Sequence, residues 1–236
     1  MGLLEPTREA IVRLLALDPV LWQVIWTSMR VALVALAIAT PPAIAVGFLL
    51  AATRFPGRRV LIVLLQSLLS FPTVVVGLVL YLLLSRRGPL GAWELLFTPE
   101  AMIIGQAVIA FPIVCAFALA AVQAADPRLI ETARLLGASP VRAALSTLRE
   151  VRFALVAAVL SGFGRVISEV GCALMVGGNI AGATRTIPTA IALETSKGAF
   201  TEGIALGIVL MLLALVVNAL LAVCQGQGGA VSGGRG

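Results

Sequence analysis

Two ionisable residues, Arg165 and Glu169, stand four positions apart in a segment that is otherwise almost entirely apolar. In a helix this spacing places both side chains on one face, where a guanidinium and a carboxylate can form an ion pair. Ionisable groups at membrane depth are costly unless they pair or face a polar cavity. The pair therefore either fixes the packing of neighbouring helices or borders a path for a charged solute, and the residues alone leave both interpretations open.

The residue types that support catalysis or metal binding are scarce. The chain has no histidine, which removes the commonest metal ligand and the usual general base. Its only lysine, Lys197, lies in the order Ser-Lys-Gly, so the Gly-Lys-Ser/Thr ending of a phosphate-binding loop is absent. The cysteines Cys115, Cys172 and Cys224 have no paired spacing. We therefore expect no catalytic residue, no metal site and no cofactor on this chain, and any ATP to be bound by another polypeptide.

The composition identifies the elements that hold these residues. Hydrophobic residues make up 60% of the chain and charged residues 12%, with a mean hydropathy of +1.09, far from a water-soluble domain. The apolar segments are hydrophobic on every side, unlike the alternating strands of an outer-membrane barrel. A helical crossing needs about 20 mostly apolar residues. We predict an all-α integral membrane protein with five transmembrane helices, at about 21–52, 60–84, 102–121, 153–176 and 204–223.

The two ends of the chain differ from this transmembrane domain, which we place at 21–223. Residues 1–20 intersperse charges with apolar positions, which predicts an amphipathic lead-in and not a cleavable signal. The glycine-rich segment 224–236 predicts a flexible C-terminal tail. The first apolar segment contains Pro41 and Pro42, and division there would leave two pieces too short to cross, so we expect one long kinked helix.

An arginine-rich insert, residues 126–151, separates two apolar segments. Asp126 can cap a helix that Gly137 ends in a left-handed conformation, and Ser139 and Pro140 can begin a second helix. Each helix has an apolar stripe, which predicts contact with a hydrophobic surface, either the membrane or a protein partner. The stripe of the second helix consists of Val141, Ala144, Leu145 and Leu148.

The order Glu131, Thr132, Ala133, followed by Gly137, resembles the EAA loop in permease subunits of bacterial ATP-binding-cassette importers. The resemblance implies the type I importer permease fold. It also implies that the insert 126–151 forms cytoplasmic coupling helices that dock on a separate ATPase subunit. Glu131, Ala133 and Gly137 are then the candidate coupling residues.

A second resemblance concerns the substrate. Residues 165–208 are similar to oxyanion permeases of the molybdate and tungstate type, and residues 190–198 are most similar to the tungstate branch. Residues 71–78, with the Gly-Pro-Leu-Gly at 88–91, resemble the second-span signature of the same group. This implies a permease that carries an oxyanion, tungstate first, from the outer side into the cytoplasm. It implies two copies around one pore, an ATPase that binds ATP and an extracytoplasmic substrate-binding protein.

For an oxyanion, hydrogen-bond donors matter more than carboxylates. Arg165 and Glu169 are candidates for the translocation path or for helix packing. The outer loop supplies further donors, although a loop is polar by default and a solvated connection without substrate contact explains them equally well. These candidates for the anion path are Asn179, Thr184, Arg185, Thr186, Ser196 and Lys197.

The net charge of +6 fits cationic loops on the cytoplasmic side better than nucleic-acid binding, which we do not expect. We predict a multi-pass protein of the bacterial plasma (inner) membrane, in contact with lipid, with its N-terminus outside and its C-terminus in the cytoplasm.

The alternatives to a tungstate permease are a molybdate, sulfate or other anion permease of the same architecture, an ion-coupled secondary transporter, or a membrane scaffold. A secondary transporter should show an internal repeat and several intramembrane acids, and we find no convincing repeat.

Overall fold

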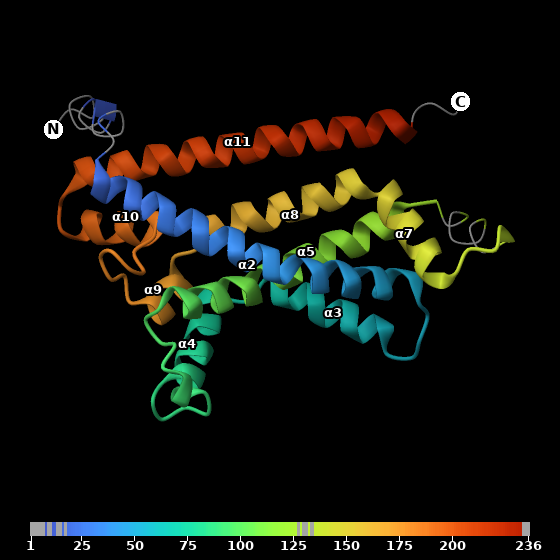
Figure 1. Ribbon diagram of the computed structural model, residues 1–236, viewed down its shortest axis with the longest axis horizontal. Coiled ribbons are helices and arrows are strands. Elements are labelled where there is room, and N and C mark those ends of the chain that lie inside the picture. The colour runs from blue at the N-terminus through green and yellow to red at the C-terminus, as the bar shows by residue number, and fades with distance from the viewer. Residues whose placement is uncertain are drawn as a thin grey trace. The chain divides into compact units, whose positions relative to one another are not determined.

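The computed structural model describes residues 18–126 and 135–232, together with Arg8, Ile11, Val12, Ala16, Arg128 and Thr132. This part of the chain is helical and contains no strand (Figure 1). Three of its helices are long and apolar enough to cross a membrane, or up to five if each of two bent pairs counts as one span.

The three long helices are α2 (Pro19–Ala52), α5 (Pro99–Ala124) and α11 (Phe200–Ser232). Helix α2 runs unbroken through Pro41 and Pro42, and Asp18 caps its start by accepting a hydrogen bond from the Val20 amide at 2.8 Å. Helix α11 extends into the segment 224–236, which the sequence predicted to be a flexible tail. No proline stops it, and each glycine costs a helix only about 1 kcal/mol relative to alanine.

Two further apolar segments are each divided into a bent pair. Helices α3 (Arg58–Leu69) and α4 (Thr73–Leu84) meet at 97°, and helices α8 (Arg152–Ile167) and α9 (Gly171–Gly177) meet at 62°. The sequence predicted one helix at 60–84 and one at 153–176. The first break has a clear cause, because Pro72 lacks an amide donor and disfavours helical geometry at the preceding residue.

The remaining helices are short. Helix α7 (Pro140–Glu150) lies in the predicted insert, α10 (Ile187–Ser196) lies between α9 and α11, and the 3-10 helix η1 (Gly91–Trp93) follows α4.

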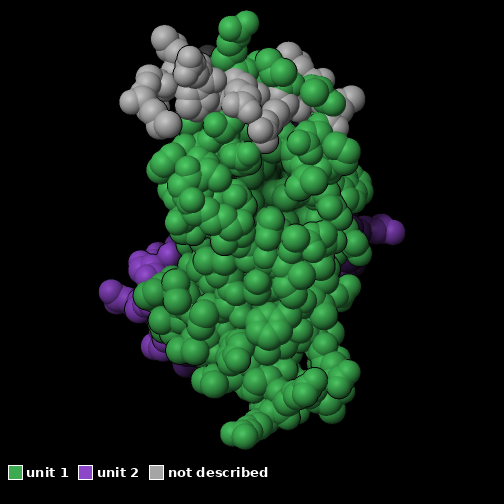
Figure 2. All heavy atoms as spheres, turned by 90° about the vertical axis from the view of Figure 1, so that its left-hand side faces the viewer, with its two compact units in different colours: residues 1–37, 71–109, 163–216 green, residues 38–70, 110–162, 217–236 purple. Residues whose placement is uncertain are grey.

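The chain forms two compact units (Figure 2). Unit 1 comprises residues 1–37, 71–109 and 163–216, and unit 2 comprises residues 38–70, 110–162 and 217–236. Helices α2, α5, α8 and α11 contribute residues to both units.

Close backbone approach holds α4 against α9 in unit 1. A Cβ atom added at Gly77 would lie 2.8 Å from Cys172 Cα, and one at Gly171 would lie 2.5 Å from Val74 Cγ2. Small residues permit such approach between membrane helices, where packing and not hydrophobicity drives association. Met102 and Val176, both fully buried, extend this core.

The loop before α10 is tied to the start of α2, also in unit 1. Ser28 Oγ accepts a hydrogen bond from the Ile187 amide at 2.7 Å, and Ile187 packs with Val24 and Leu206 in a second apolar cluster. Unit 2 has its own core of Ala43, Leu50, Leu65, Val114, Cys115 and Leu119. These cores fix the ends of the helices that carry the polar residues described below.

Candidate functional site

The predicted ion pair is present at the break between α8 and α9. Arg165 Nη1 donates to Glu169 Oε2 at 2.8 Å, which confirms that the two side chains pair. The other carboxylate oxygen, Glu169 Oε1, accepts a hydrogen bond from the Cys172 amide at 3.0 Å. Glu169 therefore neutralises the Arg165 guanidinium and also accepts from an otherwise unpaired amide in the first turn of α9.

The two partners of this pair differ sharply in exposure. The Glu169 side chain is 2% exposed, whereas that of Arg165 is 43% exposed. Both oxygens of the carboxylate are engaged, while the guanidinium has five N–H donors and uses one of them on Glu169. Ser168 beside them is exposed and donates to the carbonyls of Gly164 and Arg165. The pair thus presents cationic donors outward and keeps its carboxylate inside.

The N-terminus of α4 lies in the same part of unit 1. Gly171 follows Glu169 by two residues, and a Cβ atom at Gly171 would lie 3.3 Å from the Val74 amide nitrogen. Pro72 precedes α4 in an extended conformation and no side chain caps the helix. The first amides of a helix carry partial positive charge and have no partner within the helix. The start of α4 therefore adds partial positive charge beside Gly171, six residues after Arg165 in the chain.

The candidates in the outer loop are mostly engaged within the protein. Thr184 is fully buried, donates to the Gly177 carbonyl and accepts from the Ile180 amide at 2.9 Å. Asn179 has a positive φ of 52° and donates to the Thr189 carbonyl at 3.2 Å. Thr186, also buried, caps α10 together with Thr189. The structure brings Asn179, Thr184 and Thr186 together, but as supports of the loop.

Arg185 has carboxylates around it. It lines a cavity of about 270 Å³ in unit 1 together with the acids Asp18, Glu194 and Glu202. Its guanidinium reaches the Asn179 carbonyl at 3.5 Å, and its buried Nε has no partner in the described part of the chain. The electrostatics of this cavity therefore do not favour an anion, in contrast to the exposed face of Arg165.

The last two outer-loop candidates, Ser196 and Lys197, lie at the C-terminal end of α10, away from the loop that precedes this helix. Ser196 Oγ donates to the Leu193 carbonyl at 2.7 Å, and Lys197 pairs with Glu194 at 3.1 Å. The Lys197 side chain is 52% exposed, so this ion pair lies in a solvated environment.

The insert begins and turns as its sequence predicts. The Asp126 carboxylate accepts from the Arg128 amide at 2.9 Å, and Gly137 has a φ of 82°, which confirms its left-handed conformation. Ser139 caps α7 by accepting from the Arg142 amide at 3.4 Å. The candidate coupling residues Glu131 and Ala133 lie outside the described residues.

The apolar stripe predicted for α7 is only partly buried within the chain, which is compatible with the predicted contact with a membrane or a partner. Ala143 and Thr147 are its buried residues, and Thr147 Oγ1 donates to the Ala143 carbonyl at 3.1 Å. Val141 and Leu145 from the predicted stripe are exposed instead, as are other apolar residues of the insert. We call this exposed group the insert patch, and it consists of Leu135, Leu136, Val141 and Leu145, with exposed fractions of 88%, 83%, 68% and 47%.

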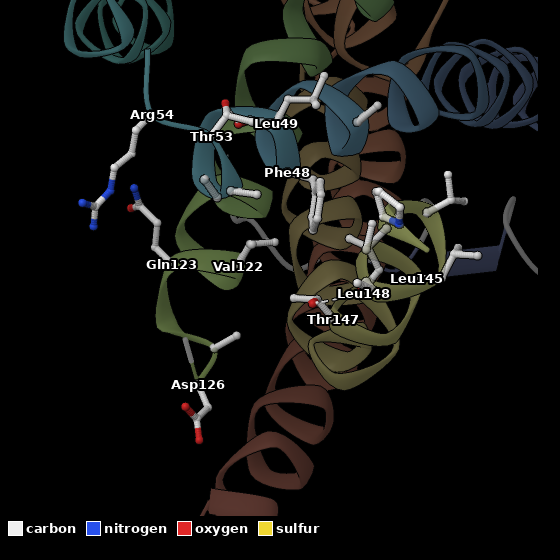
Figure 3. Close-up of a pocket in the computed structure, with 18 residues that line it drawn as sticks. Phe48, Leu49, Thr53, Arg54, Val122, Gln123, Asp126, Leu145, Thr147 and Leu148 are labelled. Carbon is white, nitrogen blue, oxygen red and sulfur yellow. Dashed lines mark hydrogen bonds between the residues drawn. The ribbon is translucent and has the colours of Figure 1, made fainter. Parts of the chain in front are cut away.

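Sequence reasoning missed a cavity of about 920 Å³ within unit 2, shown in Figure 3. It is formed where α2 and α5 end and α7 runs, and its walls are largely apolar. Arg54, Gln123 and Asp126 also line it, together with Thr53 and Thr147. No local motif marks this cavity, because its lining comes from three separate segments, 45–54, 122–126 and 140–148. Among the described residues no group of three potential ligands could hold a metal ion.

These features define an all-α, multi-pass membrane protein with broken apolar segments and an amphipathic helical insert. Residues 43–225 match the family described as binding-protein-dependent transport system inner membrane component, and the chain belongs to this family. Members of this family are membrane subunits of transport systems.

Named relatives cover most of the chain. A probable anion ABC transporter permease protein of Haloferax volcanii is 46% identical over 189 residues, 78% of this chain and 80% of that protein. The tungstate uptake system permease protein TupB of Campylobacter jejuni is 46% identical over 70% of this chain and 69% of its own length. The TupB of Peptoclostridium acidaminophilum is 38% identical over 92% of this chain and 95% of its own length.

The fold has a counterpart among solved structures. A chain of the inward-facing MetNI methionine ABC transporter matches with a TM-score of 0.67, covering 88% of this chain and 98% of that one at 19% identity. At this identity the match concerns the fold alone, and it confirms the prediction of a type I importer permease fold.

Proposed function

We propose that this chain is the permease subunit of an importer that carries an oxyanion, tungstate by preference, into the cytoplasm. The observation that carries this proposal is the 46% identity to a tungstate uptake permease over 70% of the chain. More distant relatives are permeases named for molybdenum and sulfate transport, at 31% and 30% identity. The relatives named for anion, tungstate and sulfate transport make an oxyanion the proposed substrate class.

In the proposed assembly two copies of the chain enclose one pore at a two-fold axis, which is the commonest symmetry of closed oligomers. Each copy presents its insert to a cytoplasmic ATPase subunit, and an extracytoplasmic binding protein delivers the anion. Leu135 and Leu136 of the insert patch support this docking, because exposed apolar groups of this kind mark interaction surfaces. Glu131, Ala133 and Gly137 belong to the same docking segment. The partner hydrolyses ATP, and its closure and opening switch the pore between outward-facing and inward-facing states.

Within the pore we propose that Arg165 contacts the anion. The guanidinium is 43% exposed and has unused N–H donors, while Glu169 is buried and holds it in place from behind. The uncapped N-terminus of α4 adds partial positive charge nearby. Broken helices whose N-termini face an anion are a recurrent way to bind substrates at membrane depth.

The outer-loop candidates have a different role in this proposal. Because Asn179, Thr184 and Thr186 are engaged in the loop, they shape the outer mouth of the path and do not bind the anion. Arg185 joins this loop through the Asn179 carbonyl. Ser196 and Lys197, at the far end of α10, form part of the outer surface available to the binding protein.

Uptake by vesicles tests the substrate. The permease, reconstituted with its ATPase and binding protein, is expected to accumulate tungstate in the presence of ATP and to prefer it over molybdate by about tenfold, a difference of about 1.4 kcal/mol. Accumulated metal is measured by mass spectrometry, with vesicles that lack the ATPase as the control. Preferential uptake of sulfate or molybdate would show that the substrate is wrong, and uptake driven by an ion gradient without ATP would show that the class of transporter is wrong.

Thiol labelling tests the proposed topology, in which the N-terminus is outside and the C-terminus is cytoplasmic. In a background that lacks Cys115, Cys172 and Cys224, single cysteines are introduced as Ser139→Cys and Ala183→Cys at exposed positions. A membrane-impermeant reagent added to intact cells is expected to label position 183 and to leave position 139 unlabelled until the cells are opened. Labelling of position 139 in intact cells would show that the insert cannot reach a cytoplasmic ATPase.

A further inference from the structure

The cavity of about 920 Å³ in unit 2 combines an apolar interior with a charged rim. Figure 3 shows Arg54, Gln123 and Asp126 along one side and Phe48 and Leu148 opposite them. A volume of this size lies within the range of roughly 300–1,000 Å³ that is typical of small-molecule sites. The cavity can therefore hold a ligand with one polar end and one apolar end.

The two charged residues on the rim, Arg54 and Asp126, do not form an ion pair with each other. Arg54 is exposed and forms no ion pair or hydrogen bond within the described part of the chain. Asp126 uses Oδ1 to accept the Arg128 amide, which leaves its Oδ2 available. The site thus offers one cation and one carboxylate oxygen, with the amide of Gln123 as a further donor.

The position of the cavity along the helices points to a lipid. It is lined by the last turns of α2 and α5, two helices long and apolar enough to cross the membrane. The ends of such helices lie at the level of the lipid headgroups. Acyl chains are as apolar as leucine side chains, so moving one from the bilayer into the cavity gains little. Any selectivity for a lipid must therefore come from its headgroup.

The headgroup that complements this rim carries both signs of charge. A phosphate matches Arg54 and Gln123, and a primary ammonium matches Asp126. A purely anionic headgroup would meet the Asp126 carboxylate, and the choline ammonium has no N–H to donate to it. We propose that the cavity binds phosphatidylethanolamine, with its phosphate on Arg54, its ammonium on Asp126 and one acyl chain along Phe48 and Leu148. In the proposed topology this end of α2 and α5 faces the cytoplasm, so the lipid would come from the cytoplasmic leaflet. Only this choice of leaflet rests on the proposed function.

Such a lipid would join the ends of α2 and α5 to α7. Ala143 and Thr147, the buried residues of α7, and Leu145 also line the cavity. The bound lipid would fill space between α7 and the two apolar helices that would otherwise be empty, and it would support the helix that carries part of the insert patch. This role concerns packing and is separate from the anion path.

Lipid retention by the purified transporter tests the proposal. The protein is loaded in vesicles of equal parts phosphatidylethanolamine, phosphatidylcholine and phosphatidylglycerol, and the lipid that stays bound is identified by native mass spectrometry. We expect phosphatidylethanolamine to be retained about tenfold over phosphatidylcholine, since one charge-assisted hydrogen bond distinguishes them.

Three variants test the residues that line the cavity. Arg54→Gln should lose this lipid. Asp126→Asn should abolish the preference for phosphatidylethanolamine, while its side-chain oxygen still accepts from the Arg128 amide. Ala144→Trp should fill the cavity and reduce retention of all lipids.

Arg59→Gln is the matched control, because Arg59 is an exposed arginine close to Arg54 in sequence that does not line the cavity. It should retain lipid as the wild type does. Equal retention by Arg54→Gln and the wild type, or a preference for phosphatidylglycerol, would overturn the proposal. Cross-linking of Ala144→Cys to the ATPase without retained lipid would show that a protein occupies the cavity instead. Because lipid binding is measured without transport, this result is independent of the uptake assay.

Discussion

Replacement of Arg165 by glutamine is expected to reduce tungstate uptake by about a hundredfold, because the loss of a hydrogen bond from a charged donor to an anion costs about 2–3 kcal/mol. Uptake by reconstituted vesicles measures this loss. Arg165→Lys should retain part of the activity, since it keeps the charge but offers a point donor in place of the planar guanidinium. The expected loss follows from the 43% exposure of Arg165 beside a buried Glu169.

A structural role for Arg165 would also predict lower uptake, because glutamine leaves the buried Glu169 without its ion pair and such changes destabilise proteins by about 3–5 kcal/mol. The double variant Arg165→Gln, Glu169→Gln separates the two roles, since it removes both charges together. We expect it to restore the amount of folded protein in the membrane, measured by size-exclusion chromatography, without restoring uptake. Recovery of uptake in the double variant would show that the pair serves packing alone.

The sequence predicts the class of fold because apolar composition and segment length are local properties. Helices α2 and α5 match predicted segments closely in position. The breaks within the other apolar segments were not predicted, although Pro72 gives a local signal for the first one. At the second break the Glu169 carboxylate accepts a hydrogen bond from the Cys172 amide, and that contact becomes visible only in three dimensions.

The candidate site was likewise predicted only in part from the sequence. The spacing of Arg165 and Glu169 predicts their ion pair, but the sequence does not reveal that one partner is 43% exposed and the other 2%. The polar residues of the outer loop appear equivalent in sequence, yet Thr184 is buried and bonded within the loop whereas Lys197 is exposed. A donor's availability depends on whether the folded backbone already uses it, and composition does not encode this.

The orientation of α7 illustrates why helical periodicity alone does not predict which face of a helix is buried within its own chain. The expected stripe of Val141 and Leu145 has the spacing of a buried face, but the smaller Ala143 and the bonded Thr147 are buried instead. A hydrophobic stripe predicts that some apolar surface covers the helix, not that this surface belongs to the same chain. Because Val141 and Leu145 also line the cavity of unit 2, their exposure indicates a molecule that the chain itself does not supply, which agrees with the proposed lipid. Leu135 and Leu136 are exposed and do not line the cavity, and they remain available for the proposed docking of an ATPase.

Glutamate at both Leu135 and Leu136 is accordingly expected to abolish co-purification of the ATPase with the permease. These side chains are 88% and 83% exposed, so the substitutions should leave the permease folded and inserted. Burial of one leucine at an interface contributes about 1.5–3 kcal/mol, so loss of both should weaken the complex by more than about a hundredfold. Affinity capture from membranes that contain equal amounts of permease measures the retained ATPase.

The matched control replaces both leucines by methionine, which keeps an apolar side chain of similar volume and should retain the ATPase. A segment that rests on the lipid surface instead would respond differently to the same variants. In that case the glutamate variant would bind the ATPase normally, and the insert would become more accessible to protease at the membrane surface. Because the two leucines are exposed within their own chain, normal ATPase binding by the glutamate variant could not arise from compensating repacking, and it would exclude Leu135 and Leu136 from the interface.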